Sequence, residues 1–181
     1  MNLIEKPLSA EYKFKGRIIN LRVDTAELPN GQTATREVIE HPGGVCIAAL
    51  TEQDELYVVR QFRYPYSEVV TELPAGKREY GEDPELCGRR ELTEETGMIA
   101  DNFIPMGELY PTPGYCGEII YLYLATGLKK GEMHPDEDEF LEVERVPLQT
   151  LVDRVLSGEI KDAKTQTLVL KIYALKTQGK L

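Results

Sequence analysis

The chain has 181 residues, of which 41% are hydrophobic and 29% charged, and its formal net charge is −10. This length and composition are typical of one soluble globular domain and too small for two ordinary ones. The negative charge argues against general nucleic-acid binding, which depends mainly on lysine and arginine, and no apolar run approaches the roughly 20 residues of a membrane-spanning helix.

Cysteine and histidine are too scarce to build a sulfur or multi-histidine metal centre. The three cysteines are widely spaced without a Cys-x-x-Cys pair, which argues against a disulfide framework and a zinc ribbon. Because only two histidines are present, carboxylates must supply most of the chemistry. Because the net charge is −10, cations must mediate contact with an anionic ligand. Residues 1–16 lack the apolar core and cleavage site of a secretory signal, so we expect a cytoplasmic protein.

The first predicted elements form an N-terminal antiparallel β-hairpin. Residues 17–27 alternate apolar and polar side chains, residues 29–31 read Pro-Asn-Gly and supply a turn, and residues 33–40 resume an extended pattern. We therefore expect residues 1–40 to form a separate β segment and residues 41–181 to form the main domain.

The main domain is predicted to mix strands and helices. Strands are expected, in chain order, at residues 45–50, 56–62, 68–73, 104–110, 118–126 and 140–146. Asp83 and Pro84 are a good N-cap and first-turn pair for a helix that runs to Gly97, and further helices are expected at residues 148–156 and 162–177. The fold class is therefore α/β in the broad sense (α+β), with strands dominant in the first half.

The segment from residue 76 to residue 98 carries a motif that points to chemistry. Its spacing is Gly-x5-Glu-x7-Arg-Glu-U-x-Glu-Glu-x-Gly-U, where U is apolar, and the fixed positions are filled by Gly76, Glu82, Arg90, Glu91, Leu92, Glu94, Glu95, Gly97 and Met98. From average residue usage, a chance match at a given start has a probability on the order of 10⁻⁹. Coincidence is therefore not a serious explanation.

The glutamates of this motif converge if the segment is helical. Glu91 and Glu95 lie one turn apart on one face, with Glu94 beside them, and like charges at this spacing repel unless a positive charge lies between them. Mg²⁺ suits such a site because it is held by a few carboxylates plus substrate phosphates, and Mn²⁺ is the alternative. The competing interpretation is a solvated acidic helix face, which normally comes with a compensating apolar stripe; Leu86 and Leu92 point in different directions and form none.

The motif resembles the Nudix box in full. The resemblance implies a Nudix-like α/β/α sandwich with a mixed β-sheet, and a hydrolase that splits a diphosphate linkage with a divalent cation. By this resemblance Glu91 and Glu95 are metal ligands together with the backbone carbonyl of Ala75. Arg90 orients the glutamates, and Glu94 belongs to the catalytic group or adds a further ligand.

Softer matches resemble the ADP-ribose pyrophosphatase subgroup of Nudix hydrolases and cover nearly the whole chain. Pro113 lies fifteen residues after Met98, in a segment similar to the subgroup's proline signature, and residues 36–38, 61–63 and 72–76 are also similar. The subgroup resemblance implies hydrolysis of ADP-ribose to AMP and ribose 5-phosphate.

Four further residues are candidates for substrate binding by the same resemblance. Arg36 and Arg63 are expected to contact phosphate or the terminal ribose, and Glu118 to accept hydrogen bonds from ribose hydroxyls. Each alone is equally typical of a surface or sheet ion pair. In the subgroup the N-terminal strands exchange between two subunits, so we expect a homodimer in which Arg17 and Arg36 reach the partner's substrate site.

The acidic run at residues 134–139 is the expected source of the general base. In the subgroup a glutamate from the matching mobile loop takes a proton from water as the water attacks phosphorus. Glu137 matches best, and Glu139 is its nearest rival or a further metal ligand. The plainer alternative is a solvated loop.

Two other functions compete with ADP-ribose hydrolysis. The same helix could serve hydrolysis of a GDP-sugar, NADH or a diadenosine polyphosphate. A sensor that binds ADP-ribose without cleaving it is the second alternative, although a pure binder does not need Arg90 and all three glutamates.

Overall fold

The structure is a computed structural model that describes residues 2–134 and 140–181. The predicted general bases Glu137 and Glu139 lie outside the described residues. The chain divides into two compact units, which we describe separately: the N-terminal unit, residues 1–43 with 110–119, and the main unit, residues 44–109 with 120–181. None of the helices in the described ranges is long and apolar enough to cross a membrane.

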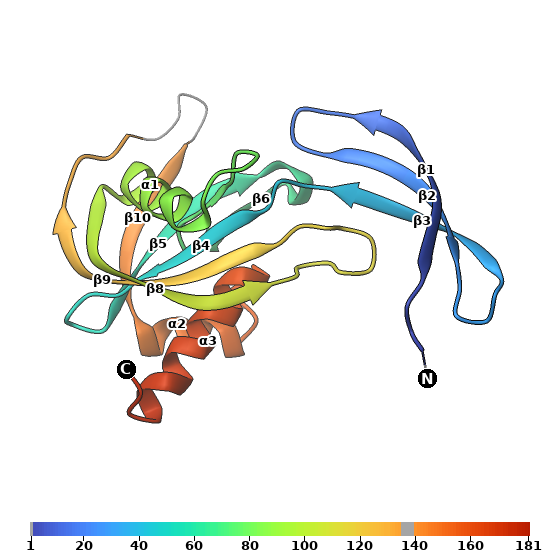
Figure 1. Ribbon diagram of the computed structural model, residues 1–181. Coiled ribbons are helices and arrows are strands. Elements are labelled where there is room, and N and C mark those ends of the chain that lie inside the picture. The colour runs from blue at the N-terminus through green and yellow to red at the C-terminus, as the bar shows by residue number, and fades with distance from the viewer. Residues whose placement is uncertain (1, 135–139) are drawn as a thin grey trace. The chain divides into compact units, whose positions relative to one another are not determined.

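The N-terminal unit contains a three-stranded antiparallel sheet. Its strands, in spatial order, are β1 (Lys6–Lys15), β2 (Asn20–Glu27) and β3 (Thr33–Glu40) (Figure 1). The predicted hairpin is confirmed as β2 and β3, although β2 begins at Asn20 and not at residue 17. We did not predict β1. All of its side chains are exposed, so burial imposes no apolar alternation on its sequence.

The main unit is built on a four-stranded mixed sheet and a three-stranded antiparallel sheet. The first has the order β7 (Ala75–Lys77), β4 (Gly44–Ala49), β9 (Ile120–Lys130) and β8 (Met98–Leu109). The second has the order β10 (Leu141–Pro147), β5 (Glu55–Arg63) and β6 (Glu68–Glu72), with the short 3₁₀ helix Tyr64–Tyr66 between β5 and β6. In the first sheet only the β4–β9 pair is parallel, as far as the described strands go.

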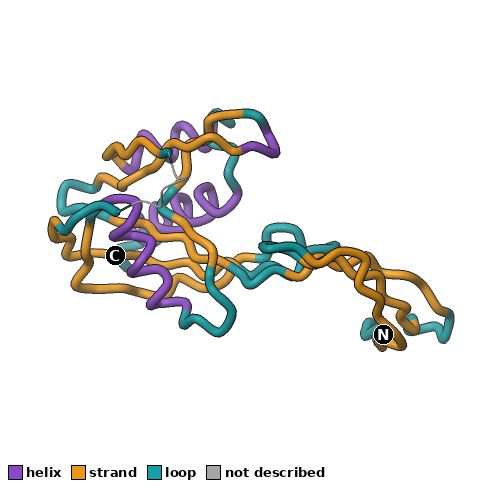
Figure 2. Tube along the Cα trace, turned by 90° about the horizontal axis from the view of Figure 1, so that it is seen from above, coloured by secondary structure: helices purple, strands orange, loops and turns teal. Residues whose placement is uncertain are grey.

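Helices cover both faces of the mixed sheet. They are α1 (Pro84–Thr96), α2 (Leu148–Leu156) and α3 (Ala163–Thr177). In the fully buried strand β4, Val45, Ile47 and Ala49 belong to the core that includes α1, whereas Cys46 and Ala48 belong to the core that includes α2 and α3. Alternate residues of one strand therefore pack against two helical layers. The arrangement of these layers can be followed in Figures 1 and 2. The predicted α/β/α sandwich with a mixed sheet is confirmed.

The predicted helices match the observed ones closely, but two strands of the main unit do not: β7 was not predicted, and β8 begins earlier than expected. The Asp83 side chain caps α1 by accepting hydrogen bonds from the amides of Glu85 and Leu86. Gly97 ends the helix in the left-handed region with φ 68°. β8 begins at Met98, where we predicted residue 104. Its buried residues Ala100, Phe103 and Met106 recur every third position, so the alternation that marks a strand is missing.

The short chain segment between β6 and β7 is tied to neighbouring elements by buried hydrogen bonds. The amide of Leu73 donates to Thr165 Oγ1 in the first turn of α3 at 2.8 Å, and the amide of Ile47 in β4 donates to the Pro74 carbonyl at 2.8 Å. Leu73 and Thr165 are both fully buried. A buried amide that loses its acceptor costs about 1–3 kcal/mol.

We therefore expect Thr165→Val, which keeps the shape and removes the acceptor, to lower the free energy of unfolding by about 1–3 kcal/mol. Thr177→Val, at the exposed end of the same helix, is the matched control and should stay within about 0.5 kcal/mol of the original chain. Urea unfolding followed by circular dichroism measures both. Equal losses in the two variants would contradict this account.

Candidate active site

The buried face of α1 carries carboxylates among its apolar contacts. Its buried residues are Cys87, Gly88, Glu91, Leu92 and Glu95. Glu91 is 7% exposed and Glu95 only 1%, while Leu86 is 66% exposed. Glutamate is rarely buried without partners, so the interpretation of these two residues as part of a solvated acidic face is wrong.

Both buried carboxylates reach residues 75–76 at the start of the short strand β7. Glu95 Oε2 accepts a hydrogen bond from the Ala75 amide at 3.0 Å. A Cβ placed on Gly76 would lie 1.9 Å from Cδ of Glu91, so the Glu91 carboxylate lies directly against the glycine backbone. Only a residue without a side chain permits this approach. Helix α1 and strand β7 thus contact each other through two carboxylates and one glycine.

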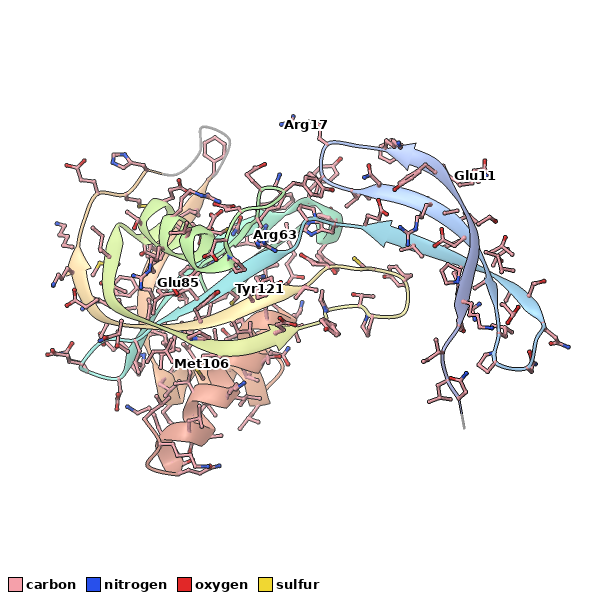
Figure 3. All side chains as sticks on the ribbon, viewed as in Figure 1. Glu11, Arg17, Arg63, Glu85, Met106 and Tyr121 are labelled. Atoms are coloured by element: carbon pink, nitrogen blue, oxygen red, sulfur yellow. The ribbon has the colours of Figure 1, made fainter. Side chains whose placement is uncertain are left out.

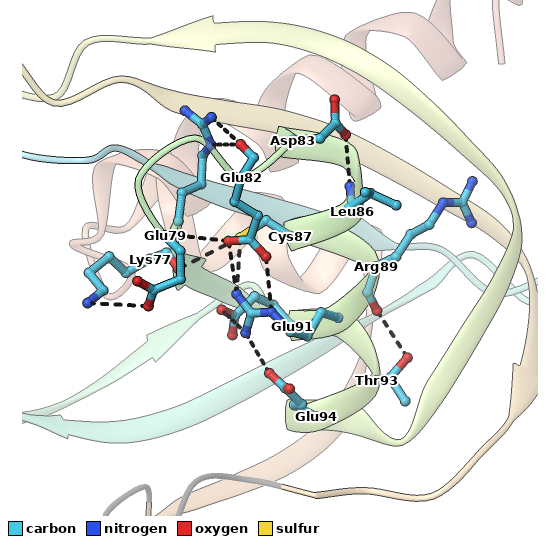
Figure 4. A network of polar contacts seen from close by, with 12 residues as sticks. Lys77, Glu79, Glu82, Asp83, Leu86, Cys87, Arg89, Glu91, Thr93 and Glu94 are labelled. Carbon is cyan, nitrogen blue, oxygen red and sulfur yellow. Dashed lines mark hydrogen bonds and ion pairs between the residues drawn. The ribbon is translucent and has the colours of Figure 1, made fainter.

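The Arg90 guanidinium lies among the neighbouring glutamates. Its Nη1 is 2.7 Å from Glu91 Oε1 and 2.8 Å from Glu94 Oε2, and its Nε is 3.2 Å from Glu82 Oε1 (Figure 4). Partial burial alone would lower the pKa of Arg90, but the hydrogen bond to Glu82 and the charge of Glu91 raise it above its ordinary value. A permanent positive charge therefore separates carboxylates that would otherwise repel one another.

The loop that enters α1 folds onto this arginine through Glu82. Glu82 Oε2 accepts a hydrogen bond from the Glu79 amide at 2.9 Å, and Arg78 donates to the Glu82 carbonyl at 3.1 Å (Figure 4). Burial alone would raise the pKa of Glu82, but the bonds from the Glu79 amide and Arg90 lower it below its ordinary value. Glu82 therefore stays ionised and holds the arginine from the loop side.

The donors gathered here fit a hard divalent cation. Two carboxylates, from Glu91 and Glu95, reach residues 75–76 of β7, where the Ala75 carbonyl would be a third oxygen donor. Mg²⁺ and Mn²⁺ prefer such oxygens while retaining waters. Burial raises the pKa of the adjacent Cys87 thiol to about 12, so the thiol is protonated in the metal-free protein. Within residues 2–134 and 140–181, no three His, Cys, Asp or Glu side chains could hold an ion by themselves. Main-chain and substrate oxygens would have to contribute.

Arg63 is anchored to a carboxylate that we did not predict. Its Nε and Nη2 donate to Glu72 Oε1 and Oε2 at 2.6 and 2.7 Å, and Glu72 is 1% exposed. Lys164 of α3 also contacts Glu72. Glu72 lies in the segment at residues 72–76, which resembles the ADP-ribose pyrophosphatase subgroup. Lys164 stands 92 positions further on and belongs to none of the motifs found in the sequence.

The other candidate residues, Arg17, Arg36 and Glu118, belong to the N-terminal unit. Arg17 is exposed in the bend between β1 and β2 (Figure 3). Arg36 Nη2 donates to Glu5 Oε1 at 2.6 Å, and Glu118 Oε1 lies 3.4 Å from His41 Nδ1. Arg36 thus forms an ion pair with Glu5, and Glu118 lies close to His41, inside the N-terminal unit, while α1, β7 and Arg63 belong to the main unit.

Comparison with known proteins gives consistent matches along the chain. Residues 40–166 match the family described as NUDIX domain, and residues 5–39 match the nucleoside diphosphate sugar hydrolase N-terminal domain. The chain is 42% identical over 168 residues to the ADP-ribose pyrophosphatase of Bacillus subtilis (strain 168), covering 91% of this chain and 90% of that protein. It is 40% identical over 179 residues to the methanol dehydrogenase activator of Bacillus methanolicus, covering 98% and 95%.

A solved structure supports the same fold. The crystal structure of an ADP compounds hydrolase superposes with a TM-score of 0.85, covering 100% of both chains at 23% identity. At this level of identity the likeness concerns the fold alone.

We expect Gly76→Ala to weaken divalent-metal binding because the added methyl would displace the Glu91 carboxylate from the loop. The affinity for Mn²⁺, measured by calorimetric titration, should fall at least about tenfold. Gly114→Ala, whose added methyl meets open space, is the control and should leave the affinity unchanged. If both variants bind Mn²⁺ like the original chain, the convergence on Gly76 has no part in metal binding.

Proposed function

This chain belongs to the NUDIX domain family, and we propose that it hydrolyses the diphosphate of ADP-ribose to AMP and ribose 5-phosphate. The observation that carries the proposal is that the carboxylates of Glu91 and Glu95 both reach residues 75–76 of β7. The substrate is supported by the similarity to the B. subtilis ADP-ribose pyrophosphatase over 91% of this chain.

The proposed metal ion is Mg²⁺, with Mn²⁺ as a substitute. Glu91, Glu95 and the Ala75 carbonyl would hold it, since all three donors are oxygens. A bound divalent cation neutralises diphosphate charge and lowers the pKa of a coordinated water. Arg90 keeps Glu91 and Glu94 in place, which supports a positioning role for Arg90 and a place for Glu94 at the edge of the catalytic group.

The proposed substrate-binding residues are Arg63, Arg36 and Glu118. Arg63 and Arg36 would contact phosphate or the terminal ribose, and Glu118 would accept hydrogen bonds from ribose hydroxyls. We further propose a homodimer formed through residues 1–40, in which Arg17 and Arg36 reach the partner's site, with residues 41–181 as the hydrolase domain. A monomeric mass in light scattering would contradict the proposal that Arg17 and Arg36 contribute to the partner's site. A cytoplasmic location is part of the same proposal.

A glutamate of the acidic run at residues 134–139 would act as general base. It would take the proton of the attacking water while the bond between phosphorus and the bridging oxygen breaks. Glu137 is the preferred residue, and Glu139 is the alternative or a further ligand.

Another nucleoside diphosphate derivative is the competing substrate. Residues 5–39 match a domain named after nucleoside diphosphate sugar hydrolases, which favours a sugar nucleotide as the second candidate. The activator from B. methanolicus is named for an effect on another enzyme and not for a reaction, so its name does not compete with hydrolysis.

We expect metal-dependent release of AMP that is faster from ADP-ribose than from GDP-mannose or NADH, and that stops with chelator. Glu95→Gln keeps an oxygen facing Ala75 but removes the charge, so kcat/KM should fall on the order of 100-fold or more. Glu85→Gln, on the exposed side of α1, removes an i,i+4 pair with Arg89 and should change activity by less than about twofold. Chromatographic product analysis measures all of these reactions.

The outcomes separate the candidate functions. Preference for GDP-mannose or NADH would reject ADP-ribose and retain the hydrolase. Binding of ADP-ribose without turnover would support the sensor in place of the enzyme.

The two candidate bases are distinguishable by kinetics. Replacing the true base should lower kcat by roughly 10²–10⁴-fold and remove the acidic limb of the pH–rate profile, because no group then loses a proton to become active. We expect this of Glu137→Gln, and expect Glu139→Gln to keep the limb. The reverse pattern would transfer the role to Glu139, and two intact limbs would exclude both residues.

A further inference from the structure

A second group of buried charges lies where β6 ends and α3 begins. Glu72 accepts two hydrogen bonds from Arg63 and a further contact from Lys164, whose Nζ also donates to Asp162 Oδ1 at 2.8 Å. The side chains of Glu72 and Lys164 are only 2% and 13% exposed. The cluster therefore holds the charges of Glu72, Lys164 and Asp162 largely away from water, and Arg63 lies at its exposed edge.

Stability alone gives a weak reason for this cluster. Taking ions out of water is expensive, and apolar side chains of similar volume often stabilise a fold as well or better. Burial alone would raise the pKa of Glu72, but Arg63 and Lys164 lower it below its ordinary value, so the carboxylate stays charged. Because keeping the Glu72 carboxylate charged costs desolvation free energy, we look for a role that depends on the orientation of this carboxylate.

Lys164 is itself fixed by the start of α3. Asp162 is the N-cap of this helix, and its Oδ2 accepts a hydrogen bond from the Thr165 amide at 2.9 Å while its Oδ1 accepts from Lys164. Thr165 in turn accepts the Leu73 amide next to Glu72. The first turn of α3 thus holds both the side chain and the following main chain of Glu72.

The consequence falls on Arg63. Two bonds to one carboxylate fix the plane of its guanidinium, because rotation would break at least one of them. The remaining terminal nitrogen, Nη1, makes no hydrogen bond within the described residues, and the side chain is 37% exposed. One edge of Arg63 is therefore locked, and the other is accessible to an anionic ligand.

We propose that Lys164 is a positioning residue for substrate binding, which holds Glu72 so that Arg63 presents its Nη1 edge in one orientation. The proposal rests on the proposed function in one respect, the binding of a substrate phosphate by Arg63. Lys164 acts through Glu72 and does not itself contact the ligand.

The first test observes Arg63 without any substrate. In protein labelled with ¹⁵N-arginine, the Nε–H signal of Arg63, assigned by its loss in Arg63→Gln, should be sharp and slow to exchange because Nε donates to a buried carboxylate. Lys164→Met should broaden this signal or remove it. Lys171→Met is the matched control, since Lys171 lies in the same helix and donates to the Met106 carbonyl.

The second test is kinetic and uses the substrate that the original chain hydrolyses best. Lys164→Met should raise KM about tenfold with kcat within about threefold, and Lys164→Arg should recover most of the loss. In an Arg63→Gln background, Lys164→Met should have no further effect on KM, because both changes remove the same contact. A purely structural role would lower stability without this dependence on Arg63.

The outcomes are decisive even if one variant or the proposed function fails. An unchanged Arg63 signal in Lys164→Met, or a KM effect that persists in full with Arg63→Gln, would overturn the proposal. If Lys164→Met does not fold, Asp162→Asn keeps the helix cap, removes the charge that holds Lys164, and should broaden the same signal. Absence of any turnover in the original chain would reject the hydrolase, whereas the Arg63 signal would still test the positioning.

Discussion

The structure of the main unit depends on two carboxylates that α1 turns inward. A helix whose buried face carries Glu91 and Glu95 cannot be held by apolar packing alone, so the two carboxylates need polar partners. Strand β7 provides the Ala75 amide and, at Gly76, room for the Glu91 carboxylate, and Arg90 of the same helix supplies a positive charge. The features that make this helix hard to bury are the same features that would bind a metal ion.

The two faces of β4 pack against different helices. On one face, apolar residues such as Ile47 pack against the apolar residues of α1 that lie beside the glutamates. The other face packs against α2 and α3, and the first turn of α3 reaches the end of β6 through Thr165 and Lys164. The mixed sheet thus sets the distance between the helix that carries the glutamates and the helix that supports Arg63.

Sequence reasoning succeeded where the information is local. The caps at Asp83 and Gly97 define α1, and fixed spacing within one helix is enough to bring its glutamates together. It failed for β1, which has no buried face, and for the start of β8, whose buried residues do not alternate. The link between Glu72 and Lys164 could not be predicted, because they stand 92 positions apart and only the tertiary fold makes them neighbours.

Three consecutive residues, Leu73, Pro74 and Ala75, are each bonded to a different element: α3, β4 and α1 respectively. Opening this segment would break contacts to three parts of the main unit at once, so it has no inexpensive local fluctuation of the kind that exposed loops show. Its motion is therefore coupled to cooperative unfolding of the whole unit. The rigidity of this segment and the stability of the main unit therefore depend on the same three residues.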